Sequence, residues 1–563
     1  MARGQQGEPH DWVTRAADDA IRHAGEGNPV TVASGASPSG PIHLGNLREF
    51  LTPHFVAEEL RRRGVEVRHL HSWDDYDRFR KVPVGVDPAW AEHIGRPLSG
   101  VPDPEGCHDS WATHFKAPLL AALTEMGVVM EEKSQTELYR AGTYREQILL
   151  AVRQRHQIEN ILARYRTKDL ALAEGDTLEE AELLMDSVAS EDHNGDGDLA
   201  RFPYRPWCRA CGRDTVTITA YDDESTDLAY TCDSCSFSGV TNLTTQDEGK
   251  LVWKVDWPMR WAWEGVNFEP GGLDHATPGS SYTVGKDVVK LFGGRAPAFV
   301  SYAFVGIAGM PKMSSSAGGV PIPADALKVL EAPMVRWLYV RRQPKQAFNI
   351  DFGPEVVRLY DEWDALGRKA SDVSKRDAHV LAFERASSVS GRALPTSPVP
   401  VPFRVLSSVA DVTAGSAEQI SRIVSHVGHA HDSVDDLSPR LERAMAWTAE
   451  FVDPSERTMV RSAPDVERLS SLSPVETQWL ALLLAGLSSE ELDLEPVTSL
   501  VYGVPKLALG MSLDADPTDQ VKADQKVFFQ LLYNLLVSAD RGPRLPTLIV
   551  ALGSAKVRSL LSV

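Results

Sequence analysis

The sequence predicts an α/β protein, with a parallel sheet in the first half of the chain and an all-helical domain at the carboxyl terminus. Near the amino terminus, a short apolar strand at 30–33 precedes an amphipathic helix from about residue 44, and a second strand follows at 65–70. This order favours two parallel strands joined by a right-handed crossover. Beyond residue 402, helical patterns alternate with turn signals, and no strand pattern of comparable length occurs.

The helix after the first strand is defined by its own residues. Leu47, Leu51 and Phe55 recur every four residues and give it one apolar face, and the basic run before Gly64 indicates its last turn. Parallel strands bind ligands at their carboxyl ends. A site is therefore expected where the two strands end, and the polar segment 72–77 follows the second of them.

The loop at 35–46 has the residues of a phosphate site. Its small residues would let a nucleotide approach the backbone, the helix amino terminus attracts phosphate, and His43 can donate a hydrogen bond to a phosphate oxygen. Taken alone, the segment is equally well an ordinary structural loop. Far downstream, Lys312 lies in a Gly- and Ser-rich stretch, 309–319, from which a mobile ammonium could reach phosphates as charge develops. A solvated lysine is the alternative interpretation.

Together, 43–46 and 312–316 resemble the HIGH and KMSKS signatures of class I aminoacyl-tRNA synthetases, in the same order and with a large insertion between them. The segments 72–83, 255–261 and 272–281 narrow the resemblance to class I lysyl-tRNA synthetases, and it extends over most of the chain.

Two positions depart from the signatures. Asn46 replaces the last histidine of HIGH, and Ser315 replaces the second lysine of KMSKS. We therefore expect His43 and Lys312 to supply more of the transition-state stabilisation.

The resemblance implies residues for each substrate. The implied catalytic residues are His43, Asn46 and Lys312. The implied ATP-binding residues are Pro38, Gly40, His43, Gly45, Asn46, Lys312, Met313, Ser314 and Ser315. The implied lysine-binding residues are Gly35, Ser37, Asp74, Asp75, Trp253, Asp256, His275 and Tyr302.

The segment 253–263 gathers tryptophans around Asp256. An aromatic-rich strand is usually part of a core. A pocket for a lysine side chain, however, needs an acid for the ammonium and aromatic walls for the methylenes, and this segment offers both.

Four of the five cysteines form two pairs, Cys208 with Cys211 and Cys232 with Cys235, at the spacing of a zinc ribbon. Four thiolates can close a tetrahedral site that stabilises a fold without doing chemistry. Disulfides are the competing explanation, which a cytoplasmic location disfavours. Cys107 stands alone, and we expect it to be buried.

Just upstream of the ribbon, 192–198 resembles the start of a calcium-binding loop. The closing carboxylate would fall at Pro203, so an acidic insertion is the better interpretation.

Composition indicates a cytoplasmic protein with no membrane span or signal peptide, and we expect a monomer. The formal charge of −20 argues at first against a nucleic-acid partner. Basic residues nevertheless cluster at 153–168 and again just after the Lys312 loop, where Arg336, Arg341 and Arg342 are candidate tRNA contacts. A solvated helix face is the alternative for each cluster.

The segments give a plan of the domains. A Rossmann-like catalytic domain is expected in two halves, 1–105 and 250–325, interrupted by a connective insertion with the zinc ribbon at 106–249. A helical stem-contact region at 326–385 and an all-helical anticodon-binding domain at 386–563 follow.

In the last domain, helical patterns occur at 417–426, 439–451, 474–486 and 525–538. Leu531, Leu532, Leu535 and Leu536 are expected in its core. The run 540–546 resembles a turn in the helical anticodon-binding domains of lysyl- and glutamyl-tRNA synthetases, which makes Arg541 and Arg544 candidate RNA contacts.

The resemblance implies ATP-dependent activation of L-lysine to lysyl-adenylate, and transfer to the 3′-terminal adenosine of tRNA(Lys), with Mg²⁺ accompanying ATP. Two alternatives stay open. A glutamyl-type class I synthetase shares the architecture, but its pocket needs a cation where this sequence offers an acid. The other alternative is a non-catalytic tRNA-binding paralogue.

Overall fold

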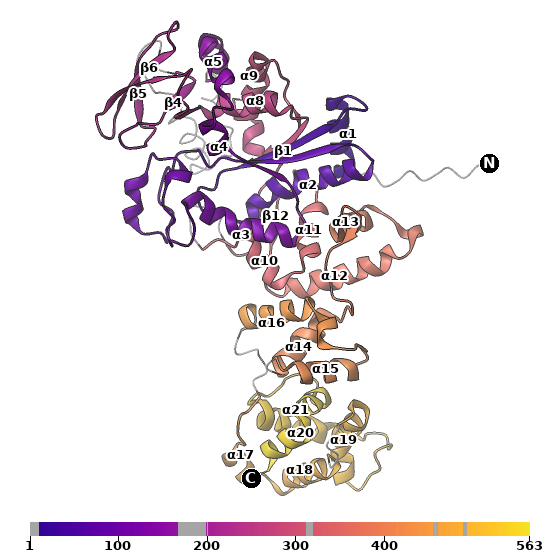
Figure 1. Cartoon of the computed structure of the whole chain (residues 1–563). Helices are drawn as coiled ribbons and strands as arrows, with labels where there is room; N and C mark the ends of the chain where they lie inside the picture. Colours follow the sequence, from indigo (N-terminus) through magenta and orange to yellow (C-terminus); the bar gives the residue numbers. More distant parts are fainter. Residues whose placement is uncertain are drawn as a thin grey trace, which may run out of the picture. The chain divides into compact units, whose positions relative to one another are not determined.

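The computed structural model describes residues 11–166, 199, 201–277, 279–310, 319–413, 415–453, 457, 460–487 and 492–562 (Figure 1). The chain divides into two compact units. Unit 1 comprises Met1–Ala326, Ala332–Ile350 and Lys369–Leu394, and unit 2 comprises Leu327–Glu331, Asp351–Arg368 and Pro395–Val563. The region 326–385 is thus shared between both units.

Unit 1 is built on a five-stranded parallel sheet in the order β10, β9, β1, β2, β3. The strands are β1 (Val30–Ala36), β2 (Val67–Trp73), β3 (Glu131–Ser134), β9 (Phe268–Gly272) and β10 (Ala298–Tyr302). From β1, the chain builds first toward β2 and β3 on one side and later toward β9 and β10 on the other. Such a reversal of strand order opens a crevice at the carboxyl ends of the central strands.

The first crossover confirms the predicted strand, helix and strand. A 3₁₀ turn, η1 (Leu44–Asn46), leads into α2 (Leu47–Arg62). The apolar face of α2 is buried, with Leu47 and Leu51 fully covered. Gly64 follows with φ +76°, a left-handed conformation that favours glycine after a helix.

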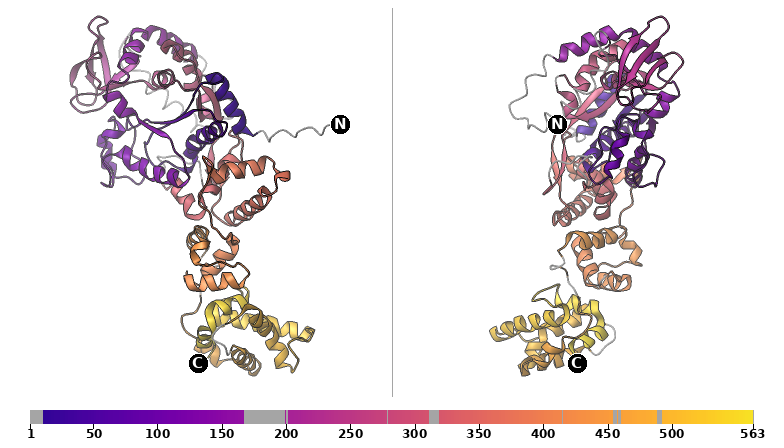
Figure 2. Two further views of the ribbon diagram at one scale, coloured as in Figure 1. Left: turned by 45° about the vertical axis from the view of Figure 1, so that its right-hand side comes forward. Right: turned by 90° about the vertical axis from the view of Figure 1, so that its left-hand side faces the viewer.

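Between β3 and β9, the chain leaves the sheet and forms a separate antiparallel ribbon. The ribbon strands are β5 (Val216–Tyr221), β6 (Asp227–Cys232) and β7 (Ser238–Asn242). A second antiparallel pair, β4 (Tyr204–Pro206) and β8 (Gly249–Leu251), connects it to the rest of unit 1. Figure 2 shows the ribbon at the periphery of unit 1 in both views. The acidic segment 192–198 lies outside the described residues.

The expectation of an aromatic strand after residue 252 is wrong, because the segment is the helix α8 (Trp253–Glu264). Trp253, Trp257 and Trp261 recur every four residues, which places their side chains on one helical face. Gly265 ends the helix in the left-handed conformation, with φ +63°.

The remaining elements of unit 1 cover the sheet and extend the insertion. Its other helices are α1 (Trp12–Ala24), α3 (Trp111–Glu125), α4 (Gln135–Arg140), α5 (Arg145–Arg153), α6 (Arg155–Arg166), α9 (Ser281–Val288), α11 (Ala332–Val340) and α13 (Ala378–Ser387). Two short strand pairs, β11 (Val305–Ile307) with β12 (Phe348–Ile350) and β13 (Ser388–Val389) with β14 (Arg392–Ala393), complete it. Helix α10 (Pro323–Val329) crosses the boundary between the units.

The described residues of unit 2 form helices and no strand, as the sequence predicts for the carboxyl-terminal region. The helices are α12 (Glu355–Ala370), α14 (Phe403–Val412), α15 (Ala417–His426), α16 (Arg440–Phe451), α17 (Val466–Ser470), α18 (Pro474–Gly486), α19 (Leu494–Ala508), α20 (Asp519–Val537) and α21 (Leu545–Leu561). The leucines expected in the core, Leu531, Leu532, Leu535 and Leu536, are all buried. Among the described residues, no helix combines the length and apolarity needed to cross a membrane.

Candidate active site

A cavity of about 770 Å³ lies at the carboxyl ends of β1, β2, β9 and β10. This is the crevice that the reversal of strand order creates. Of the residues predicted to hold lysine, six line the cavity: Gly35, Ser37, Asp74, Trp253, His275 and Tyr302. The structure therefore brings together side chains from four strand ends and from the first turn of α8.

An acidic side chain that sequence analysis missed, Glu49, lies in this cavity. Glu49 stands in the first turn of α2, where its carboxylate accepts hydrogen bonds from the Tyr302 hydroxyl and from the Gly35 backbone N–H. Burial raises the pKa of Glu49 to about 8. A partner of opposite charge stabilises the ionised form of a buried carboxylate whose pKa is raised by burial.

The aromatic face of α8 forms one wall of the cavity. Trp253 and Trp257 stack with their ring centroids 5.3 Å apart. Trp257 and Trp261 each donate an indole hydrogen bond to Glu269 on β9, at 3.0 and 2.6 Å. The edge of His275 meets Trp257, with ring centroids 5.5 Å apart. Glu269 thus fixes Trp257 and Trp261, and Ser281 accepts the indole N–H of Trp253, in an arrangement that suits an aliphatic chain ending in a cation.

The three aspartates predicted at the amino-acid site have different surroundings. Asp74 lines the cavity and forms an ion pair with Arg260 at 2.9 Å. Asp75 points away from it, because its carboxylate accepts hydrogen bonds from Lys116, Ser134 and Thr136.

Asp256 is also outside the cavity lining. It is fully buried, accepts a hydrogen bond from the Tyr139 hydroxyl at 2.6 Å and forms an ion pair with Arg260 at 3.2 Å. Neither Asp75 nor Asp256, both predicted at the amino-acid site, lines the cavity, and both carboxylates have protein partners instead.

His43 is held as a neutral hydrogen-bond donor. The Gly45 backbone N–H donates to His43 Nδ1 at 3.0 Å, which leaves the ring proton on Nε2. Burial lowers the pKa of His43 to about 4, so the ring is neutral near pH 7. A Cβ on Gly45 would lie 2.8 Å from this ring, so glycine is required there. The Asn46 side chain accepts a hydrogen bond from the His43 backbone N–H at 3.2 Å and lines the cavity.

Both ends of the Lys312 loop lie beside this motif. The Leu44 backbone N–H donates to the Pro321 carbonyl at 3.0 Å, and a Cβ on Gly45 would lie 3.3 Å from the Val305 carbonyl. Lys312, Met313, Ser314 and Ser315 themselves lie outside the described residues. Pro38 and Gly40 are buried on either side of Ser39, which lines the cavity.

The four ribbon cysteines converge at one point of the insertion. Their sulfur atoms all lie within 4.8 Å of one another, and the closest pairs are 3.6 and 3.7 Å apart. A disulfide requires about 2.05 Å, whereas tetrahedral thiolates at about 2.3 Å from a zinc ion lie at the spacing seen here. Cys107, which we expected to be buried, is exposed.

The candidate tRNA contacts also differ in accessibility. Arg336 is fully buried, and its guanidinium donates to the carbonyls of Met126 and Ala386, both at 3.0 Å. The prediction of Arg336 as a tRNA contact is therefore wrong. Arg341 and Arg342 are half-buried against Trp337 and Phe348. Arg541 and Arg544 are exposed.

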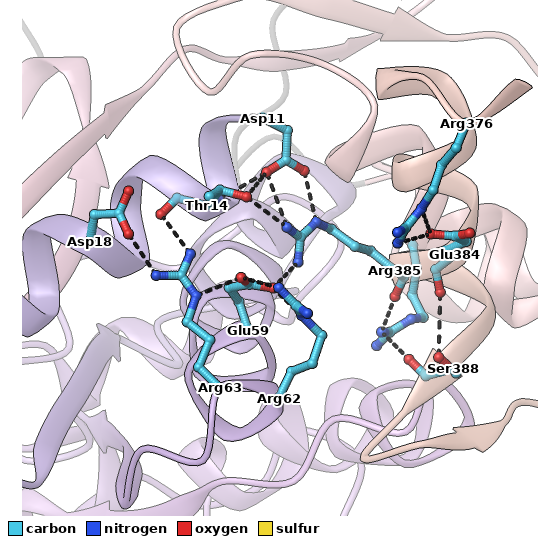
Figure 3. Close-up of polar contacts among 11 residues, drawn as sticks. Asp11, Thr14, Asp18, Glu59, Arg62, Arg63, Arg376, Glu384, Arg385 and Ser388 are labelled. Carbon is cyan, nitrogen blue, oxygen red and sulfur yellow. Dashed lines mark hydrogen bonds and ion pairs between the residues drawn. The ribbon is translucent and has the colours of Figure 1, made fainter. Parts of the chain in front are cut away.

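A second cavity of unit 1, of about 990 Å³, is lined by charged residues of α1, α2 and α13. Its arginines face acids (Figure 3). Arg385 bonds Asp11 at 2.7 Å and Glu59 at 2.8 Å, and Glu59 also accepts from Arg62 and Arg63. The positive charge is compensated within the protein, so we assign no anion site there.

Little in the sequence identifies Glu49 and Glu269 as residues of the site. Glu49 follows the His43 motif by six positions, where an acidic residue in the first helical turn is ordinary. Glu269 lies in a segment whose spacing does not indicate which residues face α8. The four-residue recurrence of the tryptophans could have identified α8 as a helix.

Comparisons with known proteins agree with this arrangement. A model of the family described as tRNA synthetases class I (K) matches residues 10–390. A protein of Streptomyces coelicolor named lysine--tRNA ligase is 52% identical over 99% of each chain. Proteins of the same name from Thermococcus kodakarensis and Pyrococcus horikoshii are each 32% identical, over 96% of this chain and 97% of theirs. The chain belongs to the class I (K) family of tRNA synthetases.

Proposed function

We propose that this protein is a lysine--tRNA ligase that activates L-lysine with ATP and transfers it to tRNA(Lys). One observation supports lysine above all: the buried Glu49 carboxylate shares a cavity with the tryptophan wall of α8. The carboxylate suits the ε-ammonium, and Trp253 and Trp257 suit the methylenes. The names of the relatives that match over nearly the whole chain agree with this choice.

The lysine α-amino group would lie near Asp74, which follows β2 and lines the same cavity as Glu49. Asp74 forms an ion pair with Arg260. Gly35 has no side chain, so the substrate would be able to approach the backbone between Asp74 and Glu49. His275 and Tyr302 complete the walls. In this orientation the lysine carboxylate faces the His43 motif.

The first reaction is an in-line attack of the lysine carboxylate on the α-phosphate of ATP, which forms lysyl-adenylate and releases pyrophosphate. His43 Nε2–H donates to a phosphate oxygen, and Lys312 adds a positive charge from its loop. The Mg²⁺ that accompanies ATP would screen phosphate charge. A terminal ribose hydroxyl of the tRNA then attacks the lysyl carbonyl and displaces AMP.

The tRNA would contact the protein through basic residues that the structure leaves accessible. Arg541 and Arg544 are exposed in unit 2, and we keep them as candidate contacts, together with the half-buried Arg341 and Arg342 of unit 1.

A structural zinc ion would be held in the ribbon by Cys208, Cys211, Cys232 and Cys235. Reduced thiols fit a cytoplasmic enzyme, and we expect it to act as a monomer.

Aminoacylation of purified tRNA tests the proposal. The full-length protein is incubated with ATP, Mg²⁺, unfractionated tRNA and one labelled amino acid at a time. We expect label on tRNA with lysine only, and on tRNA(Lys) when single species are supplied. Charging with glutamate instead would identify a glutamyl-type enzyme. Binding of tRNA without any charging would identify a non-catalytic tRNA-binding protein.

A further inference from the structure

One buried arginine of the active-site cavity, Arg260, forms ion pairs with two carboxylates. Its Nη1 lies 2.9 Å from Asp74 Oδ1, and its Nη2 lies 3.2 Å from Asp256 Oδ2. The three side chains are almost completely buried, with exposed fractions of 6% for Arg260, 7% for Asp74 and 0% for Asp256. Of the two acids, only Asp74 lines the cavity. A single positive charge is therefore divided between an acid that a substrate can reach and an acid that it cannot.

The elements that carry these residues fix their positions. Asp256 and Arg260 are four residues apart on α8, so their side chains lie on the same face of the helix. Asp74 directly follows β2, and its backbone N–H donates to the carbonyl of Ala36, the last residue of β1, at 2.9 Å. The sheet thus holds Asp74 in place, and Arg260 joins it to the helix.

The Arg260 guanidinium also lies over an aromatic ring of the cavity wall. Its Cζ is 5.4 Å from the centroid of the Trp253 ring, which is within the range of a cation–π contact. The charge of Arg260 thus has three partners within the protein and is not directed to Asp74 alone. Burial raises the pKa of Asp74 to about 6, and the charge of Arg260 acts in the opposite direction, so Asp74 is ionised at neutral pH.

The ion pairs leave hydrogen-bonding capacity unused. Within the part of the chain that the structure describes, Asp74 Oδ1 and Asp256 Oδ2 accept no hydrogen bond, and Arg260 Nε and Nη2 donate none. Buried polar atoms without a hydrogen bond are uncommon in native proteins. An ammonium group brings three N–H donors and a positive charge, so it would complete the surroundings of the Asp74 carboxylate on the side of the cavity.

Asp256 has two further partners, which come from elements before α8. The Tyr139 hydroxyl of α4 donates to its carboxylate at 2.6 Å, and Lys250 Nζ of β8 lies 3.7 Å from Asp256 Oδ2. Lys250 also forms an ion pair with Asp77. The more positive charge Lys250 supplies to Asp256, the less Asp256 draws from Arg260. Lys250 and Asp256 should therefore influence Asp74 in opposite directions, both through Arg260.

We infer that Asp256 is a positioning residue for the amino-acid substrate: it shares Arg260 with Asp74, so that the Asp74 carboxylate keeps negative charge for the α-ammonium of lysine. The inference rests on the proposed function, and it gives Asp256 an indirect role in place of the predicted contact with lysine. Two other cations line the cavity, the exposed Arg80 and the half-buried Lys254. Water screens their charges more strongly than the charge of the buried Arg260.

The test measures the lysine KM of full-length variants in pyrophosphate exchange with tRNA present. Asp256→Asn leaves Arg260 to Asp74 and should raise the lysine KM about 5- to 50-fold, while the KM for ATP changes little. Lys250→Met makes Asp256 more dependent on Arg260 and should lower the lysine KM about 2- to 10-fold. The double variant should lie between the two single variants. As a control, Asp247→Asn removes an ion-paired acid of unit 1 that is not in the cavity lining, and it should leave the lysine KM unchanged.

A lysine analogue without the α-amino group, ε-aminocaproate, separates the effect of charge from damage to the pocket. As a competitive inhibitor against lysine, it should have the same inhibition constant in the wild type and in both single variants. If Asp256→Asn does not fold, Lys250→Met still tests the sign of the effect.

Three results would overturn the inference while leaving the proposed function intact. They are a lysine KM that rises in Lys250→Met, a lysine KM that is unchanged in folded Asp256→Asn, and inhibition constants for ε-aminocaproate that rise together with the lysine KM. The first and third would show that these residues only support the fold. A wild type without lysine-dependent exchange would overturn the proposed function, and this inference with it.

Discussion

Tyr302 at the end of β10 donates a hydrogen bond to Glu49 in the first turn of α2, across 253 positions of sequence. The contact joins two elements that contribute to the cavity and fixes a buried carboxylate in its lining. The same carboxylate accepts the Gly35 backbone N–H at 3.2 Å. Because Tyr302 and Gly35 are both fixed by strands, the acid is oriented before lysine binds, which reduces the entropy lost on binding.

Replacing Glu49 should weaken lysine binding strongly. A charge-assisted hydrogen bond contributes about 1.5–3 kcal/mol, so Glu49→Gln should raise the lysine KM about 10- to 100-fold while the KM for ATP changes little. Tyr302→Phe keeps the acid and removes only its partner, so it should have a smaller effect. Lysine-dependent pyrophosphate exchange measures both. A lysine KM that is the same in Glu49→Gln and wild type would rule out the proposed role of the acid.

Lysine binding should also depend on pH through the same group. The pKa of Glu49 is raised to about 8, so the carboxyl is protonated at neutral pH in the free enzyme and must lose its proton to bind an ammonium. The kcat/KM for lysine should therefore rise as pH increases toward about 8 and then level off, until the lysine ε-amino group itself deprotonates near about 10.4. Glu49→Gln should lack this rise; a rise that persists in the variant assigns it to another group.

His43 should act without titrating in the neutral range. Its pKa of about 4 keeps the ring neutral above about pH 5, so kcat at saturating lysine and ATP should show no step near pH 6.5 that depends on His43. His43→Ala should lower kcat about 100- to 1000-fold, as expected for a lost donor to a developing charge. His43→Gln, which retains an N–H group, should keep more activity than His43→Ala. Equal losses in both variants would indicate that the donor is unimportant.

The charged network of the second cavity should stabilise the fold. Burial acts to raise the pKa of Glu59, but hydrogen bonds from Arg62, Arg385 and Arg63 hold it at about 2. The stabilisation is therefore present above the unfolded pKa of about 4.3 and is lost as pH falls toward 2. Glu59→Gln should lower the free energy of unfolding by about 2–3 kcal/mol at pH 7, and by less as the pH is lowered through this window.

Chemical denaturation at several pH values measures this effect. Glu384 offers a control, because its ion pair with Arg376 is partly exposed to solvent. The side chain of Glu384 is 36% exposed and that of Arg376 is 38% exposed. Glu384→Gln should change the free energy of unfolding by under about 1 kcal/mol. A Glu59→Gln effect that is equally small, or that does not diminish at low pH, would contradict this account of the network.

Local sequence patterns predicted much of the fold. Leu47, Leu51 and Phe55 recur at helical spacing, and α2 follows that pattern from its first residue to the turn at Gly64. The carboxyl-terminal helices likewise match segments whose apolar faces are visible without any tertiary context. The spacing of the four ribbon cysteines predicted their convergence.

The composition of the cavity was harder to predict, because it depends on which side chains of distant elements face one another. Asp74 and Asp75 are adjacent in the chain, but only Asp74 lines the cavity, because the Asp75 carboxylate is held by Lys116, Ser134 and Thr136. Glu49 and Tyr302 meet only through the strand order. Arg336 belongs to a basic cluster in the sequence, but tertiary packing buries it.

The most direct test of the central claim is pyrophosphate exchange with the wild-type protein, run with each amino acid in turn, with and without tRNA. We predict that lysine alone supports exchange, in at least one of the two conditions, because Glu49 and the tryptophan wall select an ammonium at the end of an aliphatic chain. Exchange with glutamate and none with lysine, in both conditions, would contradict the account.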